Sequence, residues 1–362
     1  MRNKVLTYIF IFVILLAGLA ATILPDMEAT FSERRYLYDF EKLQASDDFS
    51  GDFEKYVLDH FVFRDLLRRM KAFSEYTFFR KSDNNELYEY NDFIIKQLYP
   101  LDEVSVHRLT EKINKIVELY ADDNRVFYSV IPDKNYFVDN NKYLKIDYGK
   151  MTTILRAGIN DEIDYIDLFD SLTLDVYYKT DHHFRIDGLN GVLSTLGAGM
   201  DIDLGIDGRD YSLGEFYPFY GAYYGQAAMN IDADTLLYLE NDLLKNCSVK
   251  IWESFDTFTD YQGVYDYEKL GSMDSYDMFL YGTKPVVTIE NPNAKNDREI
   301  IIFKDSFANS LTPLLVESYS KITLVDLRLV NHTVLDHFID FEDADILFLY
   351  STMVVNNSSI LK

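Results

Sequence analysis

The C-terminal part of the chain carries the pattern that most constrains the fold, because short strand patterns alternate there with helix patterns. The segments 299–303, 322–327 and 346–350 are short and mostly apolar, which predicts strands. Apolar residues at helical spacing over 311–319 and a helix pattern at 334–338 separate them. Strands that are joined by short helical connections pair in parallel through right-handed crossovers. The sequence therefore predicts a parallel sheet.

Similar patterns occur earlier in the chain. Residues 125–131 form a largely apolar strand pattern, and 163–168 form a second, shorter one. A helix pattern over 109–119 precedes the first strand, and another begins within 188–196. Apolar residues make up 48% of the chain, enough for a substantial core. We therefore expect an α/β fold in which helices flank the sheet.

A serine and an Asp-x-His pair supply the parts of a nucleophilic site. Ser306 follows the first of the C-terminal strands, and open α/β sheets bind ligands at the carboxyl ends of their strands. A serine hydroxyl needs a base, which a histidine oriented by a carboxylate provides. If residues 177–181 are extended, Asp181 and His183 lie on one side of the chain and His182 on the other. Taken alone, a serine at this turn is also typical of a helix cap.

The segment Tyr178-Lys179-Thr180-Asp181-His182-His183-Phe184 resembles the signature of the DHHW family, relatives of the periplasmic alginate O-acetyltransferases with SGNH-hydrolase-like folds. Four more stretches resemble other parts of the family, in the family order, at 53–65, 276–282, 304–309 and 325–328. Asp and His precede Ser, which is the reverse of the order in ordinary SGNH hydrolases. The resemblance therefore implies an SGNH-hydrolase-like (flavodoxin-like) parallel sheet in a circularly permuted form.

The same resemblance implies an activity. Ser306 would be the nucleophile, His183 the general base and Asp181 its orienting carboxylate. Ser306 would carry an acetyl group as an ester and pass it to a hydroxyl of a cell-surface polysaccharide. The acetyl donor would come from a membrane-bound O-acyltransferase partner. Two alternatives stay open: a carbohydrate acetyl-esterase with the same triad, and a non-catalytic polysaccharide-binding or scaffold protein of the same fold.

Other candidate site residues follow from the resemblance and from position. The backbone N–H groups after Ser306 could stabilise an oxyanion, and Gly282 could supply a further donor, although a turn glycine is the simpler interpretation. Phe184 replaces the tryptophan of the family name and keeps an aromatic ring for substrate contact. Arg328 could bind an acidic sugar or pair with a carboxylate. Lys134, after the strand at 125–131, could also line the site.

Composition restricts the partners. The formal net charge of −25 is the opposite of what a nucleic-acid-binding protein needs, so we expect no nucleic acid. An anionic polymer would need a local basic groove, which the sequence does not show clearly. Cys247 is the only cysteine, so the chain has neither an intramolecular disulfide nor a Cys-rich metal site.

The N-terminal segment predicts export. Val5 to Leu24 is almost entirely apolar, and about 20 residues of helix span roughly 30 Å, the thickness of a bilayer core. Arg2 and Lys4 favour a cytoplasmic N-terminus. We expect residues 1–24 to be a signal anchor, a single transmembrane helix that holds the body at the outer face of the cell membrane. The small residues around Ala20 could instead form a cleavage site, which would make the protein secreted.

We expect residues 25–49 to be a juxtamembrane linker and 50–362 one extracytoplasmic SGNH-like domain, with an irregular insertion near 200–275. Apolar residues recur at helical spacing between residues 53 and 73, which predicts an amphipathic helical region. His60 lies within it, and we interpret it as a packed or capping histidine.

Asp181-His182-His183 also resembles the metal-binding motif of manganese-dependent DHH phosphoesterases. A two-metal site of that kind needs several more aspartate motifs. The pairs Asp201/Asp203 and Asp232/Asp234 are expected by chance in so acidic a chain. We therefore expect no metal and no cofactor.

Overall fold

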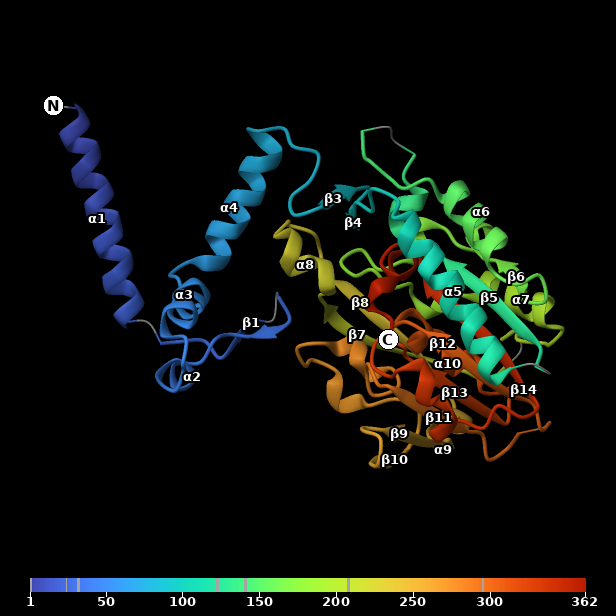
Figure 1. Cartoon of the computed structure of the whole chain (residues 1–362). Coiled ribbons are helices and arrows are strands. Elements are labelled where there is room, and N and C mark those ends of the chain that lie inside the picture. The colour runs from blue at the N-terminus through green and yellow to red at the C-terminus, as the bar shows by residue number, and fades with distance from the viewer. Residues whose placement is uncertain are drawn as a thin grey trace.

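The computed structural model describes residues 2–23, 25–30, 33–121, 124–139, 142–206, 209–294 and 296–362. Within these residues eight strands form one sheet at the centre of the body, with helices on both faces (Figure 1). In spatial order the strands are β10 (Phe258–Gln262), β9 (Ser248–Trp252), β11 (Val286–Glu290), β13 (Lys321–Val325), β12 (Glu299–Lys304), β14 (Ala344–Ser351), β5 (Val126–Ile131) and β6 (Asp164–Asp167).

The other elements surround this sheet. The α-helices are α1 (Arg2–Ile23), α2 (Phe40–Gln44), α3 (Phe49–Asp59), α4 (Arg64–Thr77), α5 (Glu103–Tyr120), α6 (Tyr148–Gly158), α7 (Asn190–Met200), α8 (Ala222–Ala227), α9 (Asp242–Asn246), α10 (Phe307–Leu315) and α11 (Thr352–Val355). Three two-stranded ladders pair β1 (Ala29–Thr30) with β2 (Arg35–Tyr36), β3 (Leu87–Tyr90) with β4 (Phe93–Lys96), and β7 (Ser212–Phe219) with β8 (Asp234–Glu240). The short 3₁₀ helices are η1 (Lys134–Phe137), η2 (Phe169–Ser171), η3 (Leu174–Val176), η4 (Ile186–Gly188), η5 (Tyr267–Lys269), η6 (Ser275–Met278), η7 (His332–His337) and η8 (Ser358–Ile360).

Apolar side chains on the two faces of the sheet fill two separate cores. In β12, Ile300 and Ile302 pack into one core, whereas Ile301 and Phe303 pack into the other. This alternation follows from the two-residue period of a strand. Helices α7 and α10 cover the first core, and α5 and α6 cover the second. A strand that is buried on both faces must be almost continuously apolar, which is why the sequence pattern of β12 and β14 is so clear.

The parallel half of the sheet agrees with the sequence. β13, β12, β14, β5 and β6 all pair in parallel, and each overlaps a predicted strand. The predicted helices at 109–119, 188–196 and 311–319 overlap α5, α7 and α10, and the short helix at 334–338 is the 3₁₀ helix η7.

The other half of the sheet corrects the fold prediction. β9 pairs antiparallel with both β10 and β11, and β11 pairs antiparallel with β13. The sheet is therefore mixed, and the prediction of a wholly parallel, flavodoxin-like sheet is wrong. The physical reason lies in the connection from β9 to β10, which is a short hairpin. Such a loop can join antiparallel strands only, since a parallel pair needs a long crossover.

The predicted transmembrane segment forms helix α1, but the prediction that it crosses a membrane is wrong. In the part of the chain that the structure describes, no helix is both long enough and apolar enough to span a bilayer. Residues 1 and 24 of the predicted span lie outside the described residues. The predicted boundaries at residues 24 and 49 stay predictions.

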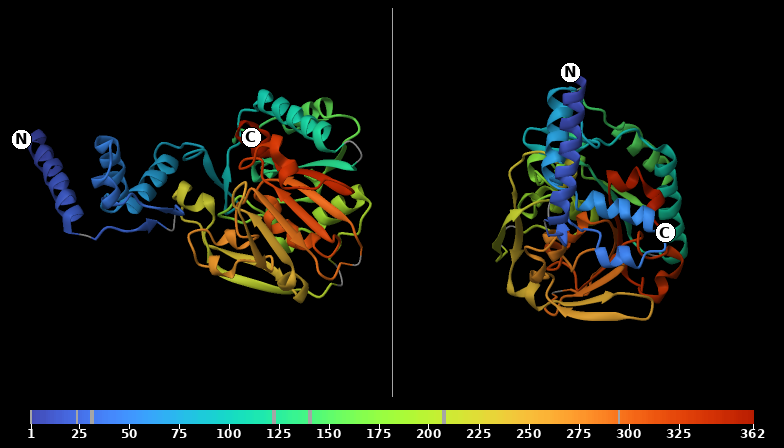
Figure 2. Two further views of the ribbon diagram at one scale, coloured as in Figure 1. Left: turned by 60° about the horizontal axis from the view of Figure 1, so that its bottom comes forward. Right: turned by 90° about the vertical axis from the view of Figure 1, so that its left-hand side faces the viewer.

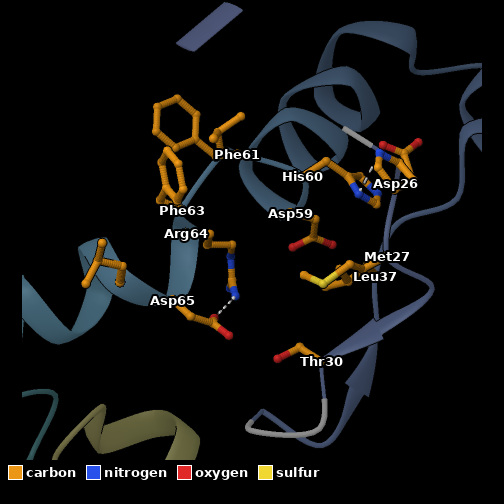
Figure 3. A pocket seen from close by; sticks show the side chains of 13 residues that line it. Asp26, Met27, Thr30, Leu37, Asp59, His60, Phe61, Phe63, Arg64 and Asp65 are labelled. Atoms are coloured by element: carbon orange, nitrogen blue, oxygen red, sulfur yellow. Dashed lines mark ion pairs between the residues drawn. The ribbon is translucent and has the colours of Figure 1, made fainter. Parts of the chain in front are cut away.

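Helices α1 to α4 lie to one side of the body, and the β1–β2 hairpin reaches from them toward it (Figure 2). His60 follows the last turn of α3, where its Nε2 lies 2.8 Å from the carbonyl oxygen of Tyr38. Its Nδ1 lies 3.5 Å from the carboxylate of Asp26. The ring lines a cavity of about 500 Å³ (Figure 3). The interpretation of His60 as a packed, capping histidine is confirmed.

Candidate active site

The Asp-His-His segment forms a tight turn. Tyr177 and Phe184 pair as an isolated antiparallel bridge, and the Tyr178 N–H donates to the carbonyl oxygen of His183 at 3.0 Å. The expectation of an extended segment was wrong here, because the chain reverses between the two bridge residues. The turn still brings Asp181 and His183 together, through its own hydrogen bonds and not through the period of a strand.

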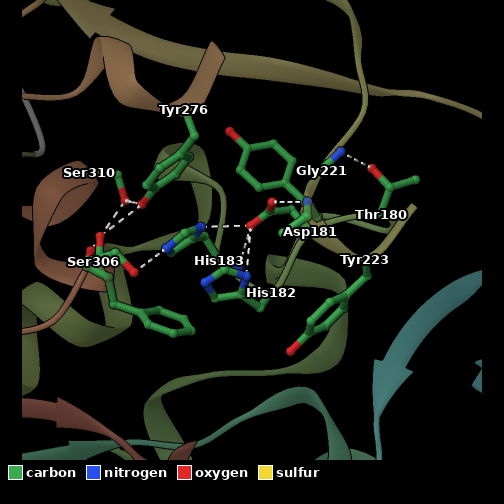
Figure 4. Close-up of polar contacts among 12 residues, drawn as sticks. Thr180, Asp181, His182, His183, Gly221, Tyr223, Tyr276, Ser306 and Ser310 are labelled. Carbon is green, nitrogen blue, oxygen red and sulfur yellow. Dashed lines mark hydrogen bonds and ion pairs between the residues drawn. The ribbon is translucent and has the colours of Figure 1, made fainter. Parts of the chain in front are cut away.

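Asp181, His183 and Ser306 form a continuous hydrogen-bonded chain (Figure 4). His183 Nδ1 lies 2.6 Å from Asp181 Oδ1, and the backbone N–H of His183 donates to the same oxygen at 3.0 Å. His183 Nε2 lies 2.7 Å from Ser306 Oγ. Ser306 directly precedes α10 at the carboxyl end of β12, and its side chain is partly exposed. The carboxylate, by contrast, is fully buried.

Backbone groups and an arginine hold the Asp181 carboxylate. The Ala222 N–H donates to Oδ2 at 2.7 Å, and Arg34 of the β1–β2 hairpin approaches the same oxygen at 3.2 Å. Burial by itself would raise the pKa of Asp181. Interactions with His182, His183 and Arg34, which include the hydrogen bond from His183, instead hold this pKa well below its usual range. The carboxylate therefore stays ionised and can stabilise a histidinium.

Asp234 fixes the turn from behind. Its carboxylate accepts hydrogen bonds from the Lys179 N–H at 2.8 Å, the Thr180 N–H at 2.8 Å and the Thr180 hydroxyl at 2.6 Å. Lys134 contributes a second clamp, because its ammonium donates to the carbonyl oxygens of Tyr178 and Lys179. Lys134 is buried, and burial lowers its pKa to about 7. The structure thus places Lys134 beneath the turn, where it contacts backbone.

Two rings enclose the imidazole of His183. Tyr276 stacks on it at 3.8 Å with an interplanar angle of 6°, and the Tyr276 hydroxyl donates to Ser310 at 2.9 Å. The His182 ring lies on His183 at 3.8 Å and 37°. The expectation that His182 points away was wrong, since it assumed an extended chain. Burial lowers the pKa of His182 to about 3, so this ring is neutral.

The start of α10 provides the donors for an oxyanion. The Phe307 N–H already donates to Asp305 Oδ1 at 3.0 Å. The N–H groups of Ser306 and Ala308 have no acceptor among the described residues, as is usual in the first turn of a helix. The N–H of Gly282 donates to Phe279 at 3.1 Å, and its carbonyl oxygen accepts from an Asn309 side chain at 3.2 Å. Gly282, at φ +82°, therefore occupies a turn and has no free N–H.

The other sequence candidates take no part in the hydrogen-bonded chain of the triad. Arg328 makes a two-pronged ion pair with Asp326, at 2.8 and 2.6 Å, which is the simpler of its two expected roles. Phe184 is fully buried and packs edge-on against Phe307 with ring centroids 5.2 Å apart, so its ring lies in the core. Neither residue makes a hydrogen bond to the Ser306 side chain among the described residues.

Asp181, His182 and His183 each offer one possible metal-ligand atom. These three atoms lie within 4.8 Å of one another, close enough to hold a metal ion. However, both ring nitrogens of His183 already have hydrogen-bond partners within the triad. Asp234, which could have served a second metal, uses its carboxylate to hold the turn. The donor set therefore fits a proton-transfer chain better than a two-metal centre.

A Ser–His–Asp chain at the carboxyl end of a mixed α/β sheet is thus the main feature of the molecule. Residues 168–325 match the DHHW family model, described as DHHW protein, and this range includes all three residues. The predicted relationship to the DHHW proteins is therefore confirmed.

Solved structures with the same fold include a DHHW family protein from Eubacterium siraeum, with a TM-score of 0.62 and 18% identity over 77% of this chain and 94% of that one. Bacillus cereus PatB1, in a structure with a sulfonyl adduct, gives a TM-score of 0.58 and 19% identity over 74% and 95% of the two chains. The O-acetyltransferase domain of Pseudomonas putida AlgJ is more distant, at a TM-score of 0.44 and 10% identity over 74% and 90%. The curated proteins contain no match to the chain.

Proposed function

We propose that this protein is an O-acetyltransferase that moves acetyl groups through Ser306 to hydroxyl groups of a cell-surface polysaccharide. The observation that carries the proposal is the unbroken chain of short hydrogen bonds from Asp181 through His183 to Ser306. The relationship to the DHHW proteins supports it. An acetyl donor supplied by a membrane-bound O-acyltransferase, and a site of action outside the cytoplasm, are further parts of the proposal.

The geometry suits two acyl-transfer steps. In the first, His183 Nε2 takes the proton of Ser306 as Oγ attacks the acetyl carbonyl carbon. The resulting oxyanion lies near the unpaired N–H groups at the start of α10, whose dipole favours negative charge. The bond to the leaving group breaks, the leaving group takes the proton from His183, and Ser306 carries an acetyl ester.

In the second step a sugar hydroxyl replaces the leaving group. His183 accepts the proton of this hydroxyl as its oxygen attacks the ester carbonyl, and Ser306 recovers a proton from His183 as the ester bond breaks. Asp181 keeps one tautomer of the imidazole throughout. If water enters instead of sugar, the same residues produce an esterase, so the acceptor decides between the two activities.

An ester-transfer assay on the full chain tests the proposal. A chromogenic acetyl ester is supplied with and without oligosaccharides, and the sugars are weighed by mass spectrometry. We expect Ser306→Ala and His183→Ala to reduce the rate by about 10³-fold or more, as in other triads. Ser272→Ala, at an exposed serine, is the matched control.

Serine-dependent gain of acetyl groups on sugar supports the transferase. Serine-dependent release of acetate, with no acetyl gain on any of the sugar acceptors, identifies an esterase. Equal rates in wild type and in both site variants would refute a catalytic role for Ser306 and favour a binding or scaffold protein.

A further inference from the structure

A cavity of about 770 Å³ lies between α4, the end of β3 and the residues that follow α8. Helix α4 and the turn after it provide one wall, and the segment around residue 143 provides another. Its volume is within the range of ligand-binding pockets in proteins. No residue of the Ser–His–Asp chain lines it.

The charge of this cavity is the reverse of the charge of the chain. Four cationic side chains line it against one carboxylate, that of Glu89, although the whole chain has a net charge of −25. Of the four, Lys81 is neutralised by Glu75 at 2.6 Å. Arg69 donates a hydrogen bond to the hydroxyl of Tyr224 at 3.5 Å, the one polar contact that it makes to another side chain in the described part of the chain. Within the described ranges, no carboxylate lies at ion-pair distance from Arg69 or from Arg80. Two guanidinium groups are therefore available to an anion.

Aromatic rings form a further part of the cavity wall, and one of them is held firmly. Tyr143 stacks on Tyr88 at 3.8 Å and 11°, and its hydroxyl donates to the Glu89 carbonyl oxygen at 3.3 Å. Lys142 lies over the Tyr143 ring, 5.0 Å from its centroid. Phe73, at the cavity wall on α4, is 62% exposed. Rings that are fixed in place offer apolar surface at little cost in side-chain entropy.

We propose that this cavity binds a segment of an acidic oligosaccharide. Guanidinium groups bind carboxylate and phosphate through paired hydrogen bonds, which suits Arg69 and Arg80. The exposed ring of Phe73 suits the apolar C–H face of a sugar ring. The inference rests on the proposed function and deepens it, because it assigns the acceptor polysaccharide to the anionic class.

Helix α8 connects the cavity to the triad. Its first residue, Ala222, donates to Asp181, whereas Ala228 and Met229, just after its last residue, line the cavity. Six helical residues rise about 9 Å, so the length of α8 separates the cavity from the Asp181 end of the triad. A polymer of several sugar units can therefore lie in the cavity while a neighbouring part of it approaches Ser306.

The test measures binding without chemistry. The full chain with Ser306→Ala is titrated calorimetrically with tetragalacturonate, with a glycerol phosphate oligomer, with neutral maltotetraose, and with phosphatidylglycerol vesicles. We expect an anionic saccharide to bind and maltotetraose not to bind, and the two anionic probes distinguish carboxylate from phosphate. The double variant Arg69→Gln/Arg80→Gln should raise the Kd of the bound probe at least about tenfold, which equals about 1.4 kcal/mol. Added salt should also weaken binding.

The control is Arg156→Gln, which removes a half-exposed arginine of α6 and should leave the Kd unchanged. Equal affinity for neutral and acidic saccharide, or equal affinity in the double variant and the control, would overturn the proposal. Binding to vesicles without binding to any oligosaccharide would also overturn it, in favour of a lipid surface.

The outcome is independent of the proposed reaction, because these titrations need no acetyl transfer. With Ser306 present, the double variant should raise the KM for an acidic acceptor and leave hydrolysis of the chromogenic ester unchanged. A loss of both activities would instead point to damage at the triad.

Discussion

Asp234 supports the Asp-His turn, and Asp234→Asn tests that support. Three donors converge on the carboxylate within 2.6–2.8 Å, two of them backbone N–H groups. An amide has one oxygen, so in either orientation its NH₂ group faces a donor, and at least one buried N–H loses its acceptor. An unpaired buried group costs about 1–3 kcal/mol, and the remaining bonds lose the benefit of the charge. We therefore expect the free energy of unfolding to fall by about 2–4 kcal/mol.

The effect on activity follows from the same geometry. The turn carries both Asp181 and His183, and a displacement of about 1 Å can reduce a rate about 100-fold. We therefore expect kcat/KM for the chromogenic ester to fall by about 10- to 100-fold in Asp234→Asn. Urea unfolding and ester kinetics at pH 8 give both quantities.

Asp232→Asn is the matched control, since Asp232 lies two residues earlier and is exposed. It should change stability by less than about 0.5 kcal/mol. If the two variants are equally stable and equally active, the view that this carboxylate holds the turn is wrong.

Three further predictions follow from buried groups. Burial lowers the pKa of Lys134 to about 7, so between that value and its unfolded value of about 10.4 the unfolded state binds more protons. The stability that Lys134 contributes is fully present above about pH 10.4, where the amine is neutral in both the folded and the unfolded state. It is lost as the pH falls toward 7. Between pH 7.5 and 9, the free energy of unfolding of wild type should therefore rise by up to about 2 kcal/mol relative to that of Lys134→Met, as measured by urea unfolding. Free energies of unfolding that change with pH equally in the two proteins would contradict this. A Cβ at Gly221 would lie 2.2 Å from that of Asp181, so Gly221→Ala should reduce ester hydrolysis strongly. Gly149→Ala, where the nearest atom is 3.5 Å away, should leave hydrolysis unchanged, and equal rates would show that the contact is easily relieved. Burial raises the pKa of the Cys247 thiol to about 12, so a thiol reagent should modify it only after unfolding, and rapid modification of the folded protein would refute this burial.

The sequence predicts the parts of this molecule whose physical requirements are local. β12 and β14 are buried on both faces, so their apolar runs are distinctive. β10 is exposed along its whole length and carries no such pattern, so the antiparallel edge was not predicted. The fold class depends on that edge.

The same distinction applies to the site. Ser306 and the Asp-His pair were found because their chemistry requires those residue types. The N–H of Ala222 could not be found, because any residue can supply a backbone donor. Asp234 could not be distinguished among 60 acidic residues, since only its burial and its three donors mark it. The basic cavity was missed because its lining comes from segments far apart in the sequence, at residues 69–81, 89, 142–143 and 228–230.

Arg34 gives the N-terminal segment a part in the site. The segment was expected to be a linker, yet its arginine pairs with the buried Asp181 and with Asp274, and it precedes the family match by more than a hundred residues. A protease that cuts between β2 and α2 would thus release a positive charge from the triad while leaving every triad residue in place. Relatives that share residues 168–325 but differ before them would inherit the same three catalytic candidates with a different electrostatic setting.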